Sequence, residues 1–126
     1  MSLEQKNILA IDDTPAIRTF LRISLQTHGA KFFEAASAME GVRLCEEVKP
    51  DLVVLDLGLP DKDGLDILPT LKMADKNGEP PKVVILSVRK EQSTKSRAFS
   101  LGADAYLTKP FLMEELLEVI ERKLEH

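Results

Sequence analysis

The chain has 126 residues, of which 44% are hydrophobic and 30% are charged, and its formal net charge is −4. This length is typical of one domain and is enough to bury a core without disulfide or metal support. The single cysteine excludes an intrachain disulfide and favours a reducing compartment, so we predict a cytoplasmic protein. The negative charge argues against nucleic-acid binding through a basic surface, and no apolar run approaches the length of a membrane span.

Both ends of the chain resemble remnants of cloning. Residues 1–3 read Met-Ser-Leu, and residues 124–126 read Leu-Glu-His, like the start of a purification tag. The alternative, that both strings are native, stays open. We predict a single domain over residues 1–126 with a core from about residue 6 to residue 124. If the ends are artificial, the natural protein could continue beyond this segment.

Short apolar runs alternate with longer stretches of helical periodicity along the chain. Each run is strand-length and rich in β-branched residues, and each is followed by a stretch whose apolar residues recur at helical spacing. The predicted strands cover residues 8–11, 31–34, 52–55, 83–86 and 105–108. The predicted helices cover residues 15–28, 38–48, 65–73, 92–101 and 113–124.

Five strand–helix units in a row predict the fold class. They favour a doubly wound α/β fold, in which a five-stranded parallel sheet carries helices on both faces. The first and third strands are nearly continuous apolar runs, as strands covered on both faces are. Residues 31–34 (Lys-Phe-Phe-Glu) are more mixed, which is typical of an edge strand. Thr14 and Pro15 fit the start of the first helix, and Gly29 fits its end.

Residues with chemical functions follow the predicted strands. Asp12 and Asp13 follow the first strand, Asp56 ends the third, Ser87 ends the fourth and Lys109 follows the fifth. The carboxyl ends of parallel strands lie at the same edge of a sheet, where open α/β folds bind their ligands. We therefore predict that three carboxylates, a hydroxyl and an ammonium group meet at this edge.

This combination of groups suits phosphoryl chemistry. Three adjacent carboxylates repel each other and need a compensating cation, and Mg²⁺ prefers such oxygen ligands. The Lys109 ammonium can donate to phosphate oxygens, and a carboxylate can attack phosphorus to form an aspartyl phosphate. A metal ion and a lysine that face the transferred group would stabilise the transition state of phosphoryl transfer.

Four segments together resemble the receiver domain of two-component response regulators. They are residues 11–15 (Ile-Asp-Asp-Thr-Pro), 55–64 (Leu-Asp-Leu-Gly-Leu-Pro, then Asp-Gly), 85–87 (Ile-Leu-Ser) and 102–111 (Gly-Ala-Asp-Ala-Tyr-Leu-Thr-Lys-Pro-Phe). The segments occur in the expected order, and the resemblance extends from residue 8 to about residue 124. It implies a CheY-like, flavodoxin-like fold with strand order 2-1-3-4-5.

The resemblance implies a role for each acidic residue at the site. Asp56 would accept a phosphoryl group from the phosphohistidine of a histidine kinase or phosphotransfer protein. Asp13 and Asp56, with the backbone carbonyl of Gly58, would bind the Mg²⁺ cofactor. Asp12 would act through a metal-bound water. Slow hydrolysis of the acyl phosphate would make this a signalling module and not a turnover enzyme.

The resemblance also implies how the signal leaves the site. Ser87 and Lys109 would bind the phosphoryl oxygens, and Tyr106 would move inward as Ser87 is drawn toward the phosphate. The Lys109–Pro110 peptide bond would be cis, as is usual in the family. Val88 stands where many relatives have Ala or Gly, and a bulkier side chain there should narrow access to the phosphate.

The expected switch surface consists of the fourth helix, the fifth strand and the fifth helix. This surface would bind one of three partners: an output domain, a separate protein, or a second copy in a phosphorylation-dependent dimer. The output domain, which is absent here, could be of DNA-binding or other type. Lys95, Tyr106 and Glu115 are the candidate interface residues, and Lys95 and Glu115 could form one ion pair across that dimer. Ala105 and Val119 stand where charged residues would form further ion pairs across that dimer. Their presence weakens the case for the dimer. We expect no direct binding of this domain to nucleic acid or membrane.

Other interpretations of the same residues stay open. A haloacid-dehalogenase-like phosphohydrolase also uses Asp, Lys and Mg²⁺, but it needs Asp-x-Asp after the first strand and a cap domain. A flavodoxin-like FMN binder needs a Ser/Thr/Gly-rich phosphate loop where Asp12 and Asp13 stand. A pseudo-receiver would lack the chemistry, although the five required side chains are present. The segment could also be a receiver module from a hybrid histidine kinase.

Overall fold

Strands and helices alternate through the computed structural model, which describes residues 3–125. The strands are β1 (Asn7–Ile11), β2 (Lys31–Ala35), β3 (Leu52–Leu55), β4 (Lys82–Ser87) and β5 (Ala105–Thr108). The helices are α1 (Pro15–Thr27), α2 (Ala38–Val48), α3 (Gly64–Leu71), α4 (Gln92–Ser100) and α5 (Met113–Leu124). Every predicted element is present, and its ends lie within two residues of the prediction.

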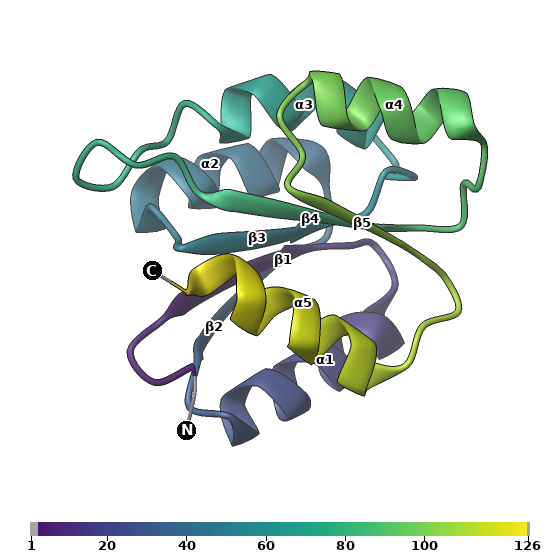
Figure 1. Ribbon diagram of the computed structural model, residues 1–126. Coiled ribbons are helices and arrows are strands. Elements are labelled where there is room, and N and C mark those ends of the chain that lie inside the picture. Colours follow the sequence, from purple (N-terminus) through teal and green to yellow (C-terminus); the bar gives the residue numbers. More distant parts are fainter. Residues whose placement is uncertain (1–2, 126) are drawn as a thin grey trace.

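The five strands form one parallel sheet in the order β2-β1-β3-β4-β5, which confirms the predicted fold class and strand order. Helices α2, α3 and α4 cover one face of the sheet, and α1 and α5 cover the other (Figure 1). The chain crosses from the β2 side of β1 to its β3 side. The carboxyl ends of β1 and β3 therefore lie next to each other at the point where the strand order reverses, which is the ligand position in open α/β sheets.

The alternation of side chains along each strand divides the core in two. In β1, Leu9 and Ile11 pack under α2 and α3, whereas Ile8 and Ala10 pack against α1 and α5. All four are fully buried, as a central strand requires. Complete burial of each large apolar side chain contributes about 1.5–3 kcal/mol. Gly41 lets α2 lie close to this strand, because a Cβ atom there would come within 2.5 Å of the Ile11 side chain.

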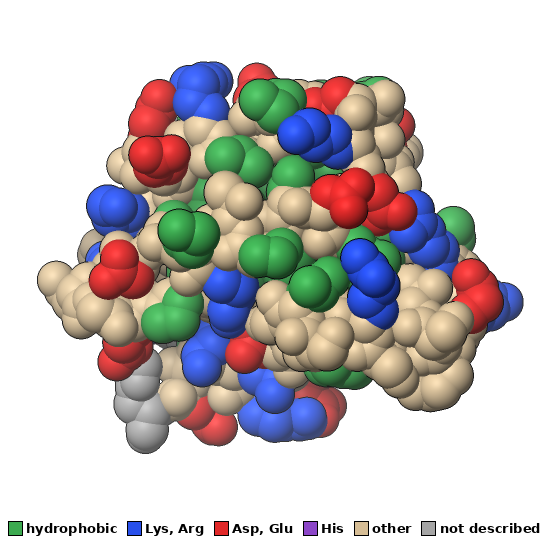
Figure 2. Space-filling model, turned by 90° about the horizontal axis from the view of Figure 1, so that it is seen from above, with side chains coloured by type: hydrophobic (Ala, Val, Ile, Leu, Met, Phe, Trp, Pro, Cys, Tyr) green, Lys and Arg blue, Asp and Glu red, His purple; other side chains and the backbone are tan. Residues whose placement is uncertain are grey.

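The edge strand β2 is only partly buried, in agreement with its mixed sequence. On the outer surface of the α2–α3–α4 layer, hydrophobic side chains are interspersed with acidic and basic side chains (Figure 2). Among the described residues, no helix has the length and apolar character needed to cross a membrane.

The terminal strings are described only in part. Residues 1, 2 and 126, which belong to the proposed cloning remnants, lie outside the described residues. Leu3 is fully buried among the residues that pack against α1 and α5. Its backbone N–H donates to the carbonyl oxygen of His28 at 3.2 Å. Whatever its origin, Leu3 is therefore part of the folded domain.

Candidate functional site

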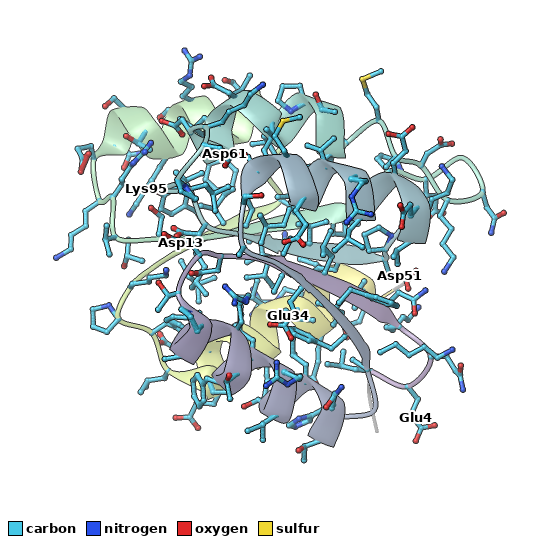
Figure 3. All side chains as sticks on the ribbon, turned by 180° about the vertical axis from the view of Figure 1, so that it is seen from behind. Glu4, Asp13, Glu34, Asp51, Asp61 and Lys95 are labelled. Atoms are coloured by element: carbon cyan, nitrogen blue, oxygen red, sulfur yellow. The ribbon has the colours of Figure 1, made fainter. Side chains whose placement is uncertain are left out.

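Three carboxylates meet at the carboxyl edge of the sheet, as predicted. Asp12 and Asp13 follow β1, Asp56 follows β3, and one carboxylate oxygen from each lies within 4.8 Å of the other two. Asp12 and Asp56 are buried, whereas Asp13 is exposed to solvent. In Figure 3, Asp13 lies with Lys95 and Asp61 at one end of the molecule, and Asp51 lies at the opposite end.

Asp12 is held on both carboxylate oxygens. Its Oδ1 accepts the backbone N–H of Thr14 at 2.9 Å, and its Oδ2 accepts the Lys109 ammonium at 2.9 Å. Thr14 occupies the N-cap position of α1, as predicted, but its side chain makes no capping hydrogen bond. The carboxylate of Asp12 instead orders the turn that leads into α1.

Lys109 approaches two of the three carboxylates. Its Nζ lies 2.9 Å from Asp12 Oδ2 and 3.6 Å from Asp56 Oδ2. Burial and the negative charge of Asp12 raise the pKa of Asp56, and Lys109 and the N–H of Gly58 oppose this rise only in part. The cluster therefore holds excess negative charge in a partly dehydrated place, which favours binding of a further cation.

The loop between β3 and α3 shapes the surroundings of Asp56. The N–H of Gly58 donates to Asp56 Oδ1 at 3.3 Å, and the Asp63 carboxylate caps α3 by accepting the N–H of Leu65. Gly64 packs so closely that a Cβ atom there would lie 2.6 Å from the carbonyl oxygen of Asp56. A larger residue at position 64 would therefore displace the loop that carries Asp56 and Gly58.

Ser87 lies buried at the end of β4 and is linked to Tyr106 through Arg89. The Ser87 Oγ accepts the N–H of Arg89 at 3.1 Å, and the Tyr106 hydroxyl donates to the carbonyl oxygen of Arg89 at 2.8 Å. Burial raises the pKa of Tyr106. The Arg89 guanidinium also forms a 2.9 Å ion pair with Asp63, which spans the loops after β3 and β4. Arg89 belongs to no sequence motif and was not predicted as a site residue.

Two of the predicted interface residues, Lys95 and Tyr106, lie against each other. The Lys95 Nζ lies 5.7 Å from the centre of the Tyr106 ring, within the range of a cation–π contact. Glu115 accepts the backbone N–H of Leu112 and so orders the first turn of α5. The Lys109–Pro110 peptide bond is cis, which confirms that prediction.

Two further residues, Arg18 and Asp61, were not predicted to be important, because they bind residues outside their own sequence neighbourhood. Arg18 of α1 reaches the carbonyl oxygen of Asp12 and the carboxylate of Glu34 on β2. Asp61, in the loop after β3, accepts the backbone N–H groups of Ala38 and Met39 at the start of α2. Neither spacing corresponds to a local motif, so only the folded arrangement reveals these contacts.

Comparison with known proteins assigns the family. The family model "Response regulator receiver domain" matches residues 8–121. The chain is 43% identical over 110 residues to the KDP operon transcriptional regulatory protein KdpE of Escherichia coli, and 37% identical to the cell cycle transcriptional regulator CtrA of Caulobacter vibrioides. Each alignment covers 87% of this chain, but only 47% of KdpE and 46% of CtrA.

Solved structures agree with this assignment. A CheY-like receiver domain from Methanospirillum hungatei is 32% identical, with a TM-score of 0.86 over 94% of this chain and 93% of that chain. Chemotaxis protein CheY4 of Vibrio cholerae is 26% identical, with a TM-score of 0.85 over 94% of this chain and 98% of that chain.

The chain therefore belongs to the response regulator receiver domain family. This assignment favours neither the phosphohydrolase nor the FMN binder. The chain spans about half the length of the curated relatives it matches.

Proposed function

We propose that Asp56 accepts a phosphoryl group from the phosphohistidine of a histidine kinase or phosphotransfer protein, in a reaction that requires Mg²⁺. Membership of the receiver family supports the reaction. One observation supports the choice of residue above all others: Asp56 is buried beside two other carboxylates and lies 3.6 Å from the Lys109 ammonium.

The acidic cluster fits Mg²⁺ by the chemistry of its donors. Asp13 and Asp56 would supply one carboxylate oxygen each, and Gly58 would supply its backbone carbonyl. Both oxygens of Asp12 already have partners, so Asp12 would act through a metal-bound water. A bound Mg²⁺ would neutralise charge on the phosphoryl oxygens and allow two anions to approach each other.

The transfer itself requires little from the protein beyond placement and charge. An Asp56 carboxylate oxygen attacks phosphorus, an O–P bond forms as the donor's N–P bond breaks, and the electron pair of that bond remains on the imidazole nitrogen. Lys109 donates to a phosphoryl oxygen from the position in which it now pairs with Asp12. The hydroxyl of Ser87 turns from the backbone of Arg89 to a second oxygen.

Rotation of Ser87 would carry the signal to the α4–β5–α5 face. Its Oγ would release the N–H of Arg89, and the carbonyl of the same residue holds the Tyr106 hydroxyl. Displacement of the loop after β4 therefore changes the position of Tyr106 and, with it, the Lys95 contact. The altered face would bind an output domain or a second copy, with Lys95 and Glu115 available for an ion pair between copies.

An apolar hollow beside the site suits the phosphoryl donor. It measures about 390 Å³ and is lined by Ile17 and Phe20 of α1, Val88, and Lys109 to Phe111 after β5. Phe20 and Val88 are 46% and 68% exposed. Val88 thus lies at the entrance to the site, where it would contact the helices that carry the phosphohistidine. This surface fits an apolar helical partner next to Asp56.

The curated relatives suggest the biological setting. They are named as transcriptional regulators and are about twice as long as this chain. We propose that the domain acts in the cytoplasm and controls an output domain that binds DNA. The receiver domain itself would contact the kinase and the output domain, and not the DNA.

Incubation with a small acyl-phosphate donor and Mg²⁺ tests the function. Wild type should gain the mass of one phosphoryl group, and Asp56→Asn should gain none. Asp66→Asn is the matched control, because Asp66 lies exposed on α3 and should label like wild type. Omission of Mg²⁺ should abolish labelling. Undiminished labelling of Asp56→Asn would overturn the assignment.

A further inference from the structure

Arg18 connects three parts of the chain at the edge of the acidic cluster. Its Nη1 donates to the backbone carbonyl oxygen of Asp12 at 2.7 Å, and its Nε donates to Glu34 Oε1 at 2.9 Å. The Arg18 side chain is only 18% exposed. Glu34 on β2 is itself held by a second arginine, Arg22, which pairs with its other carboxylate oxygen. Figure 3 shows Glu34 on β2, away from the labelled Asp13.

The carbonyl that Arg18 binds belongs to the peptide unit between Asp12 and Asp13. The orientation of this planar unit sets the direction in which the Asp13 side chain leaves the backbone. Asp12 is also held by its N–H, which donates to Ala35, and by both carboxylate oxygens. Within residues 3–125, by contrast, the Asp13 carboxylate has no hydrogen-bond partner, so only its backbone can fix its direction.

We propose that Arg18 is a positioning residue for cation binding, which holds the Asp12–Asp13 peptide so that the Asp13 carboxylate faces the ligand site. The proposal rests on the proposed function in one respect, namely that Asp13 is a cation ligand. Glu34 takes part indirectly, because it holds the guanidinium in place and offsets its charge. A lysine cannot replace Arg18, since a single ammonium does not reproduce the fixed fork that reaches both acceptors.

Positioning and simple charge predict opposite effects when Arg18 is removed. Loss of a positive charge beside an acidic cluster should, by Coulomb attraction alone, tighten the binding of a divalent cation. Loss of a group that orients a metal-binding side chain should instead weaken the binding of the cation. Replacement of outer hydrogen-bond partners of metal sites typically reduces affinity about tenfold or more. The sign of the change therefore separates the two roles.

The experiment is a Mg²⁺ titration followed by backbone amide NMR shifts on four proteins: wild type, Arg18→Gln, Arg18→Lys and Arg22→Gln. Arg22→Gln is the matched control, because it removes the same charge from the same helix and the same Glu34 partner, but leaves the Asp12 carbonyl bonded. We expect the dissociation constant to rise about tenfold for Arg18→Gln, and to stay within about twofold for Arg22→Gln. Arg18→Lys should weaken binding nearly as much, although its charge is kept.

The titration distinguishes failure of the positioning role from failure of the proposed metal site. The same spectra report folding, and Arg18→Lys provides a milder test should Arg18→Gln unfold. Wild-type or tighter affinity in both Arg18 variants overturns the positioning role while the proposed metal site stands. An equal loss of affinity in Arg22→Gln also overturns it, because the Asp12 contact is intact there. Absence of Mg²⁺ binding by wild type refutes the proposed metal site itself.

Discussion

Aspartates occupy both ends of the sheet, but their surroundings differ. At the amino end, Asp51 accepts the N–H of Asn7 at the start of β1 and pairs with Lys76. Asp104 accepts the N–H of Val83 in β4 and the Lys72 ammonium, both at 2.8 Å. Each of these carboxylates has a lysine partner of its own and completes the hydrogen bonding of a strand.

At the carboxyl end, three carboxylates lie together, and one lysine, Lys109, pairs with two of them. Asp12 takes most of the Lys109 ammonium, Asp56 is left at 3.6 Å, and Asp13 lies in solvent. The same residue type therefore stabilises the fold at one end and carries unbalanced charge at the other. Aspartates that are paired and bonded to backbone amides serve structure, whereas a crowded set with too few cations is suited to bind a metal ion and phosphate.

The largest expected change in stability comes from removal of Lys109, the cation that pairs with two carboxylates of the cluster. Lys109→Met should lower the free energy of unfolding by about 3 kcal/mol in metal-free buffer, because two ion pairs are lost and the carboxylates repel each other. Chemical unfolding with and without Mg²⁺ measures this effect. Saturating Mg²⁺ should recover much of the loss. An equal loss in both buffers would contradict the view that Mg²⁺ and Lys109 balance the same charge.

Asp104→Ala should lower the free energy of unfolding by about 2 kcal/mol, because the Lys72 ammonium and the N–H of Val83 lose their shared partner. Urea unfolding gives the value. The folded fraction should still be labelled by the acyl-phosphate donor at the wild-type rate. A specific loss of labelling at full folding would place this end of the sheet in the functional site.

Asp56→Asn, unlike the two preceding substitutions, should stabilise the protein. It should raise the midpoint of thermal unfolding by about 3 °C in metal-free buffer. Burial and Asp12 raise the pKa of Asp56 in the folded chain, so its ionised form destabilises the fold. This penalty is complete above the folded pKa and disappears below the unfolded pKa. The advantage of Asp56→Asn should therefore shrink as pH falls. A lower midpoint for Asp56→Asn at neutral pH would contradict the proposed crowding.

The smallest effect is expected for Asp61→Asn. Asp61 is exposed, and the N–H groups of Met39 and Ala38 lower the pKa of its carboxyl. Its stabilising contribution is present above the unfolded pKa and is lost as pH falls through the folded pKa. Asp61→Asn should therefore lower the unfolding midpoint slightly at neutral pH and not at all in strong acid. A difference that persists in acid would show that hydrogen bonding to the ionised carboxylate is not the cause.

The sequence was sufficient to predict the architecture, because the fold rests on repeated local patterns. The helical spacing in residues 113–124 and the apolar run in residues 52–55 each determine an element without knowledge of the rest. Since parallel strands end at one edge, the positions of Asp12 and Asp56 followed from the strand ends alone.

The finer contacts could not be predicted, because they depend on how loops approach each other. Asp61 caps a helix that starts 23 residues earlier, and Arg89 joins Asp63 to Tyr106 through its side chain and its carbonyl. Thr14 shows the limit of a local rule: the residue type predicted a side-chain cap, but the nearby carboxylate of Asp12 binds its N–H instead. Such choices depend on the energies of competing partners in the folded chain.

The most direct test of the central claim is to locate the phosphoryl group. The phosphorylated protein can be treated with borohydride, which reduces an aspartyl phosphate to homoserine, and then digested and sequenced by mass spectrometry. We expect homoserine at position 56, and unmodified aspartate at positions 12 and 13. Homoserine at another position, with Asp56 intact, would contradict the account.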